Sequence, residues 1–167
     1  MDEKILTQLS IELGKKLKQQ ELWVTFAESC TGGWLAKALS DIAGSSAYFD
    51  RGFVTYSNKA KHQMLGVSET VLQQHGAVSD PVVREMATGA LKAAQADLAV
   101  SVSGIAGPDG GSEKKPVGTV WFGFAHRTAN GIEVVTHHCC FNGDRNEVRL
   151  QAAIYSLKTL LSEIIKN

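Results

Sequence analysis

The segment spanning residues 28–33 contains residue types that could carry out nucleophilic catalysis. It reads Glu-Ser-Cys-Thr-Gly-Gly and lies between a short apolar stretch and the start of a helical pattern. A hydroxyl at that place lies near the unpaired N–H groups of a helix N-terminus, which bind anions or stabilise a developing oxyanion. The two glycines permit a tight turn and a close approach by a ligand. Ser29 is therefore a candidate nucleophile; the alternative is that Ser29 or Thr31 only caps the helix.

The segment 56–61 offers a base for such a nucleophile. It reads Tyr-Ser-Asn-Lys-Ala-Lys. A serine nucleophile needs a group that accepts its proton, and an uncharged lysine amine is a known variant of the triad histidine. Burial or a neighbouring cation must lower the pKa of that lysine. Lys59 and Lys61 are both candidates, and Tyr56 could relay the proton or orient the amine; the alternative is that both lysines are solvated helix residues.

A glycine-rich segment, residues 103–112, is a candidate ligand-binding loop. It reads Ser-Gly-Ile-Ala-Gly-Pro-Asp-Gly-Gly-Ser and directly follows an apolar stretch. Backbone N–H groups of such a loop can bind a phosphate, although its spacing fits neither a Walker A loop nor the GxGxxG fingerprint. Arg145 and Arg149, near the start of a later helix, are further candidates for binding a phosphate. The alternatives are a mobile surface loop and two exposed helix residues.

Residues 137–140 read His-His-Cys-Cys, which invites a metal hypothesis. Alternate residues of a strand face opposite sides, so at most two of these side chains share a face. Two ligands are too few for a metal site without partners elsewhere in the chain. A structural role for this segment is favoured, and we predict neither a metal nor another cofactor.

The rest of the chain supplies the elements that position these segments. Helical spacing of apolar residues and short apolar runs alternate along the sequence. Strands are predicted over 22–27, 48–56, 98–103, 117–125 and 133–141, and helices over about 3–19 and 34–42, after Ser57 or Asn58, after Ser68, over 80–95 and from Asp144 onward.

This order predicts the α/β fold class, as a three-layer α/β/α sandwich. Its sheet is expected to be mixed and mostly parallel, with about five or six strands and an antiparallel hairpin around Asn130-Gly131. In open α/β sheets, ligands bind beyond the carboxyl ends of the strands. Segments 28–33, 56–61 and 103–112 each follow such an end, so we expect them to meet at one site.

Composition narrows the classes of function. A length of 167 residues fits a single domain over 1–167. Lys and Arg total 17, as do Asp and Glu, so the formal net charge is zero, which argues against nucleic-acid binding and against a polybasic membrane anchor. Three cysteines without a CxxC motif favour a reducing, cytoplasmic location. No signal peptide is visible, and no apolar stretch approaches the roughly 18 residues of a membrane span.

Four segments together resemble the C-terminal domain of the competence/damage-inducible protein CinA. They are Ala27-Glu-Ser-Cys-Thr-Gly-Gly33, Gly52-Phe-Val-Thr-Tyr-Ser-Asn58 with Lys61, Gly76-Ala-Val-Ser79, and Ser103-Gly-Ile-Ala-Gly-Pro-Asp-Gly-Gly111 with Lys115-Pro-Val-Gly-Thr-Val120. The resemblance covers nearly the whole chain, which lacks the additional N-terminal domain of full CinA. It is therefore similar to the stand-alone form of the family, the nicotinamide-nucleotide amidohydrolases or NMN deamidases.

The resemblance implies a bacterial, cytoplasmic amidohydrolase that acts in pyridine nucleotide salvage. Such an enzyme hydrolyses the carboxamide of nicotinamide mononucleotide to nicotinate mononucleotide and ammonia. A homodimer or a higher homo-oligomer is implied as well. The partner is then a small-molecule substrate, a pyridine mononucleotide, with no cofactor, nucleic acid or membrane.

The resemblance also implies roles for individual residues. The catalytic residues would be Ser29 as nucleophile, Lys61 as base and Tyr56 as its aid, with Lys59 as a second lysine nearby. Reasoning from the residues themselves, rather than the resemblance, adds those expected to bind substrate, which are Cys30, Thr31, Gly32, Gly33, Ser103, Gly104, Gly107 and Arg145. Among these, the N–H groups around Cys30 and Thr31 would hold the oxyanion and Arg145 the phosphate.

A non-catalytic function is the alternative hypothesis. The same glycine-rich segments would bind a nucleotide in a regulatory module linked to competence or to the DNA-damage response. Ser29 would then be only a helix cap.

Overall fold

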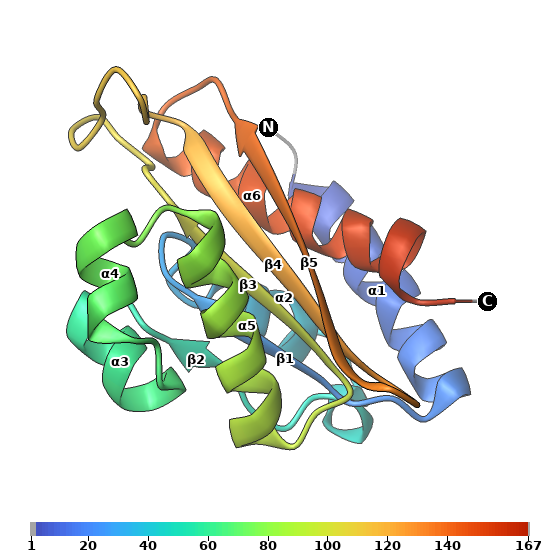
Figure 1. Cartoon of the computed structure of the whole chain (residues 1–167). Coiled ribbons are helices and arrows are strands. Elements are labelled where there is room, and N and C mark those ends of the chain that lie inside the picture. The colour runs from blue at the N-terminus through green and yellow to red at the C-terminus, as the bar shows by residue number, and fades with distance from the viewer. Residues whose placement is uncertain (1–2, 167) are drawn as a thin grey trace.

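Short runs of β-branched and aromatic residues form a five-stranded sheet in the part of the chain that the computed structural model describes, residues 3–166. Its order is β2-β1-β3-β4-β5, with β1 parallel to β2 and β3, and β4 antiparallel to β3 and β5 (Figure 1). The strands are β1 (Val24–Glu28), β2 (Phe53–Val54), β3 (Leu98–Gly104), β4 (Thr119–Thr128) and β5 (Gly131–Cys140).

The predicted mixed α/β sheet is confirmed, but its parallel and antiparallel pairs are equal in number within residues 3–166. The expected parallel majority is absent there because the segment between β3 and β4 contains no crossover helix, so β4 returns beside β3 in the opposite direction. The β4–β5 hairpin closes at Gly131, as predicted, where Thr128 pairs with that glycine.

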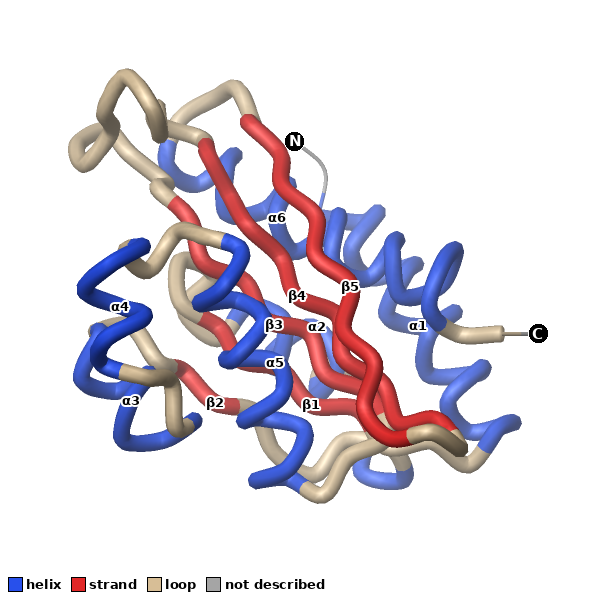
Figure 2. The backbone as a smooth tube through the Cα atoms, in the orientation of Figure 1, coloured by secondary structure: helices blue, strands red, loops and turns tan. Residues whose placement is uncertain are grey.

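Helices cover both faces of the sheet, which confirms the three layers (Figures 1 and 2). One face carries α1 (Glu3–Gln20), α2 (Trp34–Ser40) and α6 (Arg145–Thr159), which continues as the π-helical turn Leu160–Ile164. The other face carries α3 (Asn58–Leu65), α4 (Glu69–His75) and α5 (Asp80–Ala94). No helix within residues 3–166 has both the length and the apolar character needed to cross a membrane.

Each face of the sheet has its own apolar core. Phe26, Phe122 and Phe124 are fully buried on the α1/α2/α6 side. Ala27 and Ala125 lie under α5 on the other side, where Met86 is fully buried. Small residues on the α5 side let that helix approach the sheet closely, whereas aromatic rings fill the wider gap beneath the other three helices.

The predicted strand over 48–56 is much shorter in the structure. Only β2, Phe53–Val54, pairs with β1; Ser45–Ala47 forms a 3-10 turn, and Phe49 makes an isolated bridge to Val24. Tyr48 is 3% exposed and lies where Gly14 of α1 leaves room for its ring. Packing of the tyrosine against α1 therefore bends the chain out of the strand that its β-rich composition predicts.

Most predicted helix starts are confirmed by their capping contacts. Ser57 caps α3 by accepting from the N–H of Ala60, and Ser68 caps α4 in the same way. Asp144 and Glu147 form a capping box at the start of α6, where the helix is predicted to begin. The start of α5 differs, because Ser79 occupies the cap position and makes no side-chain capping bond.

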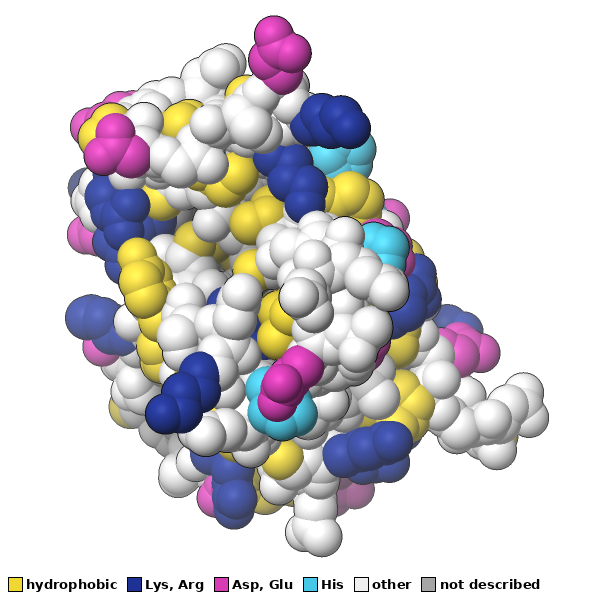
Figure 3. All heavy atoms as spheres, turned by 60° about the vertical axis from the view of Figure 1, so that its left-hand side comes forward, with side chains coloured by type: hydrophobic (Ala, Val, Ile, Leu, Met, Phe, Trp, Pro, Cys, Tyr) yellow, Lys and Arg dark blue, Asp and Glu magenta, His cyan; other side chains and the backbone are white. Residues whose placement is uncertain are grey.

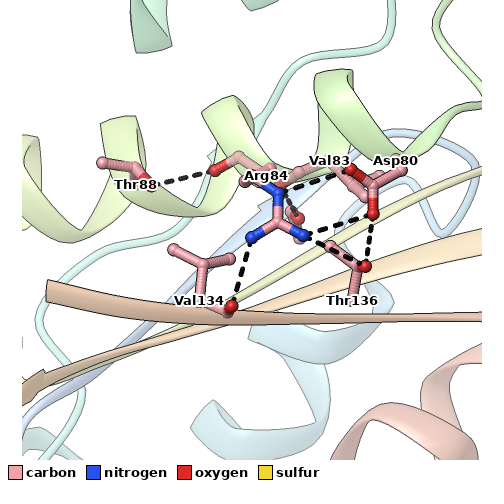
Figure 4. A network of polar contacts seen from close by, with 7 residues as sticks. Asp80, Val83, Arg84, Thr88, Val134 and Thr136 are labelled. Carbon is pink, nitrogen blue, oxygen red and sulfur yellow. Dashed lines mark hydrogen bonds and ion pairs between the residues drawn. The ribbon is translucent and has the colours of Figure 1, made fainter.

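Asp80, the first residue of the helix predicted over 80–95, joins α5 to the edge strand β5 (Figure 4). Its carboxylate accepts from the Thr136 hydroxyl and from the Arg84 guanidinium one turn along α5. Arg84 also donates to the carbonyl oxygen of Val134, at 3.2 Å. The hydrogen bond from Thr136 is the main reason that the pKa of Asp80 lies below its usual value. These bonds fix the segment just before α5 relative to the sheet.

The His-His-Cys-Cys segment lies on the edge strand β5. His137 is hydrogen-bonded through Nδ1 to the Tyr155 hydroxyl at 2.6 Å, and the ring of His138 stacks on Trp121 at 4.7 Å. Within residues 3–166, no three His, Cys, Asp or Glu side chains gather as a metal site would require.

Gly89 in α5 is a position where a methyl group should harm the fold. A Cβ there would overlap the backbone carbonyl of Leu65, the last residue of α3. Alanine favours helices by about 1 kcal/mol over glycine, but overpacking costs about 1–3 kcal/mol. We therefore expect Gly89→Ala to lower the free energy of unfolding in urea by up to about 2 kcal/mol. Lys92→Ala, at an exposed position of the same helix, is the control; a Gly89→Ala protein more stable than wild type would show that α3 and α5 are not in close contact.

Candidate active site

Ser29 directly follows β1 at the carboxyl edge of the sheet. Its N–H donates to the carbonyl oxygen of Val102 in β3, at 2.9 Å, so the β1–β3 pairing continues one residue beyond the strand. Its side chain is largely buried, at 8% exposure for the residue. Two central strands therefore fix the position of this hydroxyl.

Lys61, the last residue of the segment 56–61, contacts Ser29. Its Nζ lies 2.9 Å from the Ser29 Oγ and donates to the carbonyl oxygen of Thr55 at 2.8 Å. The residue is 1% exposed. Lys59 is exposed and lines a different hollow, of about 600 Å³, between α3 and α4. The structure thus brings Lys61, and not Lys59, to the candidate nucleophile.

The surroundings of Lys61 favour its uncharged form. Burial lowers its pKa from 10.5 to about 8. No carboxylate forms an ion pair with this amine among the described residues. An amine with a pKa near 8 is about one-tenth uncharged at pH 7 and about half uncharged at pH 8, and the lone pair of that form can accept a hydrogen bond from the Ser29 hydroxyl.

Cys30, next to the candidate nucleophile, is not itself suited to that role. The residue is buried, and desolvation raises the pKa of its thiol to about 12. The thiolate is the nucleophilic form of cysteine. At neutral pH this side chain therefore remains a protonated, apolar group, and Ser29 stays the candidate nucleophile.

The start of α2 is stabilised by Glu28, which overturns the alternative that Ser29 or Thr31 is only a helix cap. The N–H groups of Leu35 and Ala36 donate to the two carboxylate oxygens of Glu28, at 2.9 and 3.0 Å. Gly33 occupies the cap position and makes no side-chain capping bond. Burial raises the pKa of Glu28, and these N–H groups oppose that effect. Ser29 is thus left free of a capping duty.

Ser29 and Lys61 open onto a cleft of about 300 Å³ at the carboxyl edge of the sheet. That volume is at the lower end of the range of small-molecule sites. Segments far apart in the sequence meet here, as predicted from the strand ends. The predicted site residues that line the cleft are Ser29, Cys30, Tyr56, Lys61, Ser103, Gly104, Gly107 and Arg145. On the face that carries α3 and α4, basic and acidic side chains are interspersed and form no single basic patch (Figure 3).

Tyr56 and Arg145 join two walls of the cleft. Arg145 donates to the carbonyl oxygen of Gly107 at 2.7 Å and to the Tyr56 hydroxyl at 2.9 Å. Tyr56 is 62% exposed. Within residues 3–166 no hydrogen bond joins Tyr56 with Lys61, and Thr55 supplies the carbonyl that orients the amine instead. The geometry therefore places Tyr56 beside Arg145 and gives no support to its predicted role as a proton relay.

The predicted binding residues Thr31, Gly32 and Gly33 do not line this cleft. They border a separate hollow of about 540 Å³, together with Trp34 and Arg149. Gly32 and Gly33 have φ values of 59° and 101°, which glycine adopts readily and other residues rarely do. These two glycines turn the chain from β1 into α2, and neither lines the Ser29 cleft.

Comparison with known proteins places this sequence in a protein family. The sequence model of the CinA C-terminal domain matches residues 6–164. The chain belongs to the CinA C-terminal domain family. The resemblance inferred from four short segments is thereby confirmed.

Relatives in the CinA C-terminal domain family match the whole chain. Proteins named nicotinamide-nucleotide amidohydrolase PncC from Enterobacter agglomerans and Escherichia coli (strain K12) are 66% and 64% identical over 167 residues, which cover 100% of this chain and 100% and 99% of theirs. The crystal structure of competence/damage inducible protein CihA from Agrobacterium tumefaciens has a TM-score of 0.90 and 45% identity, covering 95% of this chain and 94% of that chain. The α/β fold is therefore shared within the family.

Sequence reasoning missed several residues that line the cleft, although some of them lie in the segments that resemble the CinA C-terminal domain. Ala77 and Val78 lie in one of the segments that resemble the family, and Asn58 and Asp109 lie in two others, but no chemistry singled them out. The contribution of Glu28 had no local signal, because its carboxylate binds N–H groups seven and eight residues further along. No capping rule relates residues at that spacing.

Proposed function

We propose that this chain hydrolyses the carboxamide of nicotinamide mononucleotide to nicotinate mononucleotide and ammonia. The contact between the buried Lys61 amine and the Ser29 hydroxyl, at 2.9 Å in a cleft, is the observation that supports it most directly. The names of two relatives that are 66% and 64% identical over the full chain support the choice of substrate.

In the first half of the proposed reaction, the Ser29 Oγ attacks the carboxamide carbon while its proton passes to the Lys61 Nζ. The negative charge that develops on the carbonyl oxygen would be held by the N–H groups of Cys30 and Thr31, which donate to no other residue in the described part of the chain. Lys61 then gives its proton to the departing nitrogen, ammonia leaves, and an ester links Ser29 to the nicotinate group.

In the second half, water takes the place of the amide nitrogen. Lys61 accepts a proton from the water as its oxygen attacks the ester carbon, and the same two N–H groups hold the second oxyanion. Collapse of this intermediate releases the carboxylate and returns the proton from Lys61 to Ser29. One water is consumed, and no metal ion or redox step takes part in the proposed scheme.

The phosphate of the substrate lies far from the bond that breaks, so its binding energy can position the amide. Arg145 is a cation at the cleft wall, next to the glycine-rich segment that begins at Ser103. We assign the phosphate to Arg145. Free nicotinamide, which lacks this group, is then a much poorer substrate than the mononucleotide.

The test is release of ammonia and nicotinate mononucleotide by the purified chain, with a chelator present and nicotinamide as the comparison substrate. Hydroxylamine in the same reaction would capture the ester as a hydroxamate, which distinguishes a covalent intermediate from direct attack by water. Tight binding of the mononucleotide without any product would contradict the proposal and favour the non-catalytic nucleotide-binding module. The cytoplasmic location and the homodimer stay predictions.

The proposed role of Lys61 predicts a pH dependence. Only the uncharged amine accepts the proton of Ser29, and burial places its pKa at about 8. We therefore expect kcat/KM to rise about tenfold per pH unit below pH 8 and to level off above it. A profile of initial rates from pH 6 to 10 measures this. A rate that is flat between pH 6 and 8 would show that the amine is not the base.

A further inference from the structure

The turn that carries Ser29 is held from behind by an arginine of α6. Arg149 Nε donates to the carbonyl oxygen of Cys30 at 2.9 Å, and its Nη2 donates to that of Thr31 at 3.1 Å. The guanidinium also lies over the Trp34 ring, 5.3 Å from its centroid. A Cβ at Gly32 would stand 3.2 Å from Nη2, so the glycine leaves room for this group. The sequence interpretation of Arg149 as a phosphate ligand does not fit these contacts.

The peptide that Arg149 holds is the central one of a β-turn. Gly32 N–H donates to the Ser29 carbonyl oxygen at 3.1 Å, which closes a turn over residues 29–32. The two central residues are Cys30 and Thr31, so the Cys30–Thr31 peptide is the unit that inverts when such a turn changes type. Its C=O and N–H point in opposite directions because the peptide is planar and trans.

This geometry fixes where the Thr31 N–H points. Because the Cys30 carbonyl oxygen faces Arg149, the Thr31 N–H faces away from it. Arg149 borders the hollow that contains Gly32 and Gly33, whereas Ser29 and Cys30 border the cleft. The Thr31 N–H donates to no other described residue. It is therefore unpaired, on the side of the peptide opposite Arg149 and two residues along the chain from Ser29.

We infer that Arg149 is a positioning residue that holds the Cys30–Thr31 peptide in the orientation required for an oxyanion hole, an inference that rests on the proposed amide hydrolysis. In the inverted turn the carbonyl of Cys30 would face the cleft and repel the oxyanion. That turn requires a positive φ at Thr31, which its β-branched side chain disfavours. Arg149 adds a charge-assisted hydrogen bond that only the productive orientation makes. A guanidinium suits the task because its Nε and Nη2 are two nitrogens in a rigid fork, each aimed at one carbonyl, whereas the donors of an ammonium group share a single nitrogen.

The test compares Arg149→Ala with Arg127→Ala. Arg127 also donates through Nε to a carbonyl, that of Ala96 at 2.9 Å, but at the opposite end of β4. Loss of one oxyanion donor typically lowers kcat about 100- to 1000-fold. Because part of the Arg149→Ala population keeps the productive turn, we expect a kcat loss of about 10- to 100-fold, with KM changed less than about threefold. Arg127→Ala should keep both constants.

A second substrate separates this inference from the choice of nucleotide. p-Nitrophenyl acetate reports acylation of Ser29 through the same oxyanion, whatever the natural substrate is. A similar loss in acylation rate for Arg149→Ala supports the inference even if the wild type does not act on nicotinamide mononucleotide. Equal acylation by Arg149→Ala and wild type overturns it, as does failure of the ester to acylate the wild type at all.

Arg149→Lys is the control for a loss of activity that comes only from impaired folding. This variant keeps the charge near Trp34 but lacks the rigid two-nitrogen fork, so its rate should stay well below that of wild type while its melting temperature stays close. Crystals of Arg149→Ala should show the Cys30–Thr31 peptide in both orientations. A wild-type kcat in the lysine variant would show that a positive charge alone is sufficient at this position, and it would overturn the positioning role of Arg149.

Discussion

Ser29→Ala is expected to lower kcat on nicotinamide mononucleotide by on the order of 10³- to 10⁶-fold while leaving the fold intact. The substitution removes the only hydroxyl that contacts the Lys61 amine among the described residues, at 2.9 Å. Lys61 keeps its hydrogen bond to the Thr55 carbonyl, so the stability cost should be about 1 kcal/mol. Ammonia release and thermal unfolding, measured on the same preparation, check both parts.

Ser156→Ala is the matched control for this variant. Ser156 is also buried and its hydroxyl also takes part in one hydrogen bond, here as the donor to the Ala152 carbonyl at 2.8 Å, but it lies within α6 and away from the cleft. Its loss should change stability by a similar amount and leave kcat unaltered. Near-normal turnover by Ser29→Ala would remove the nucleophile from the proposed mechanism. Loss of hydroxamate formation in Ser29→Ala alone would show that the trapped ester is carried by this residue.

The fold and the two central residues were predictable because their signals are local. Apolar runs, helix caps and glycines each act within a few residues, so the elements could be read along the chain. The meeting of segments 28–33 and 56–61 followed from one topological fact, that parallel strands bring their carboxyl ends to the same edge. Between Lys59 and Lys61, residue type could not decide; only the position of Thr55 and the start of α3 place one amine inside and leave the other in solvent.

The remaining features depend on contacts between distant segments. Arg149 binds carbonyls 118 and 119 residues earlier in the chain, and Arg145 reaches Tyr56 across 89 residues. Nothing in the sequence distinguishes an arginine that will bind a phosphate from one that will bind a carbonyl. The same holds for Tyr48, whose burial against α1 ends a strand that β-propensity alone predicts. Sequence patterns thus pointed to the two side chains that the structure brings into contact, Ser29 and Lys61, whereas the groups that orient them required the tertiary structure.

Lys61→Met is expected to abolish turnover and, at the same time, to make the protein more stable. Without its base, Ser29 loses at least about 10³-fold in reactivity. A pKa that falls from 10.5 to about 8 on folding means that burial disfavours the charged amine. At about 1.4 kcal/mol per unit, the penalty is about 3 kcal/mol. Methionine leaves the Thr55 carbonyl without its donor, which costs about 1–2 kcal/mol. The net increase in the free energy of unfolding at pH 7 should therefore be about 1–2 kcal/mol.

The sign of the pH dependence makes this prediction specific. Below pH 8 the amine is charged in both states, so the full penalty of burying it is present. Between pH 8 and about 10.5 the unfolded chain binds more protons than the folded one, so wild-type stability rises with pH. Above that range the penalty is gone. The advantage of Lys61→Met over wild type in urea unfolding should therefore be largest near pH 7 and should shrink toward pH 10. A methionine variant that is less stable than wild type at pH 7, by an amount independent of pH, would mean that folding does not depress the pKa of Lys61, and the serine would then need a different base.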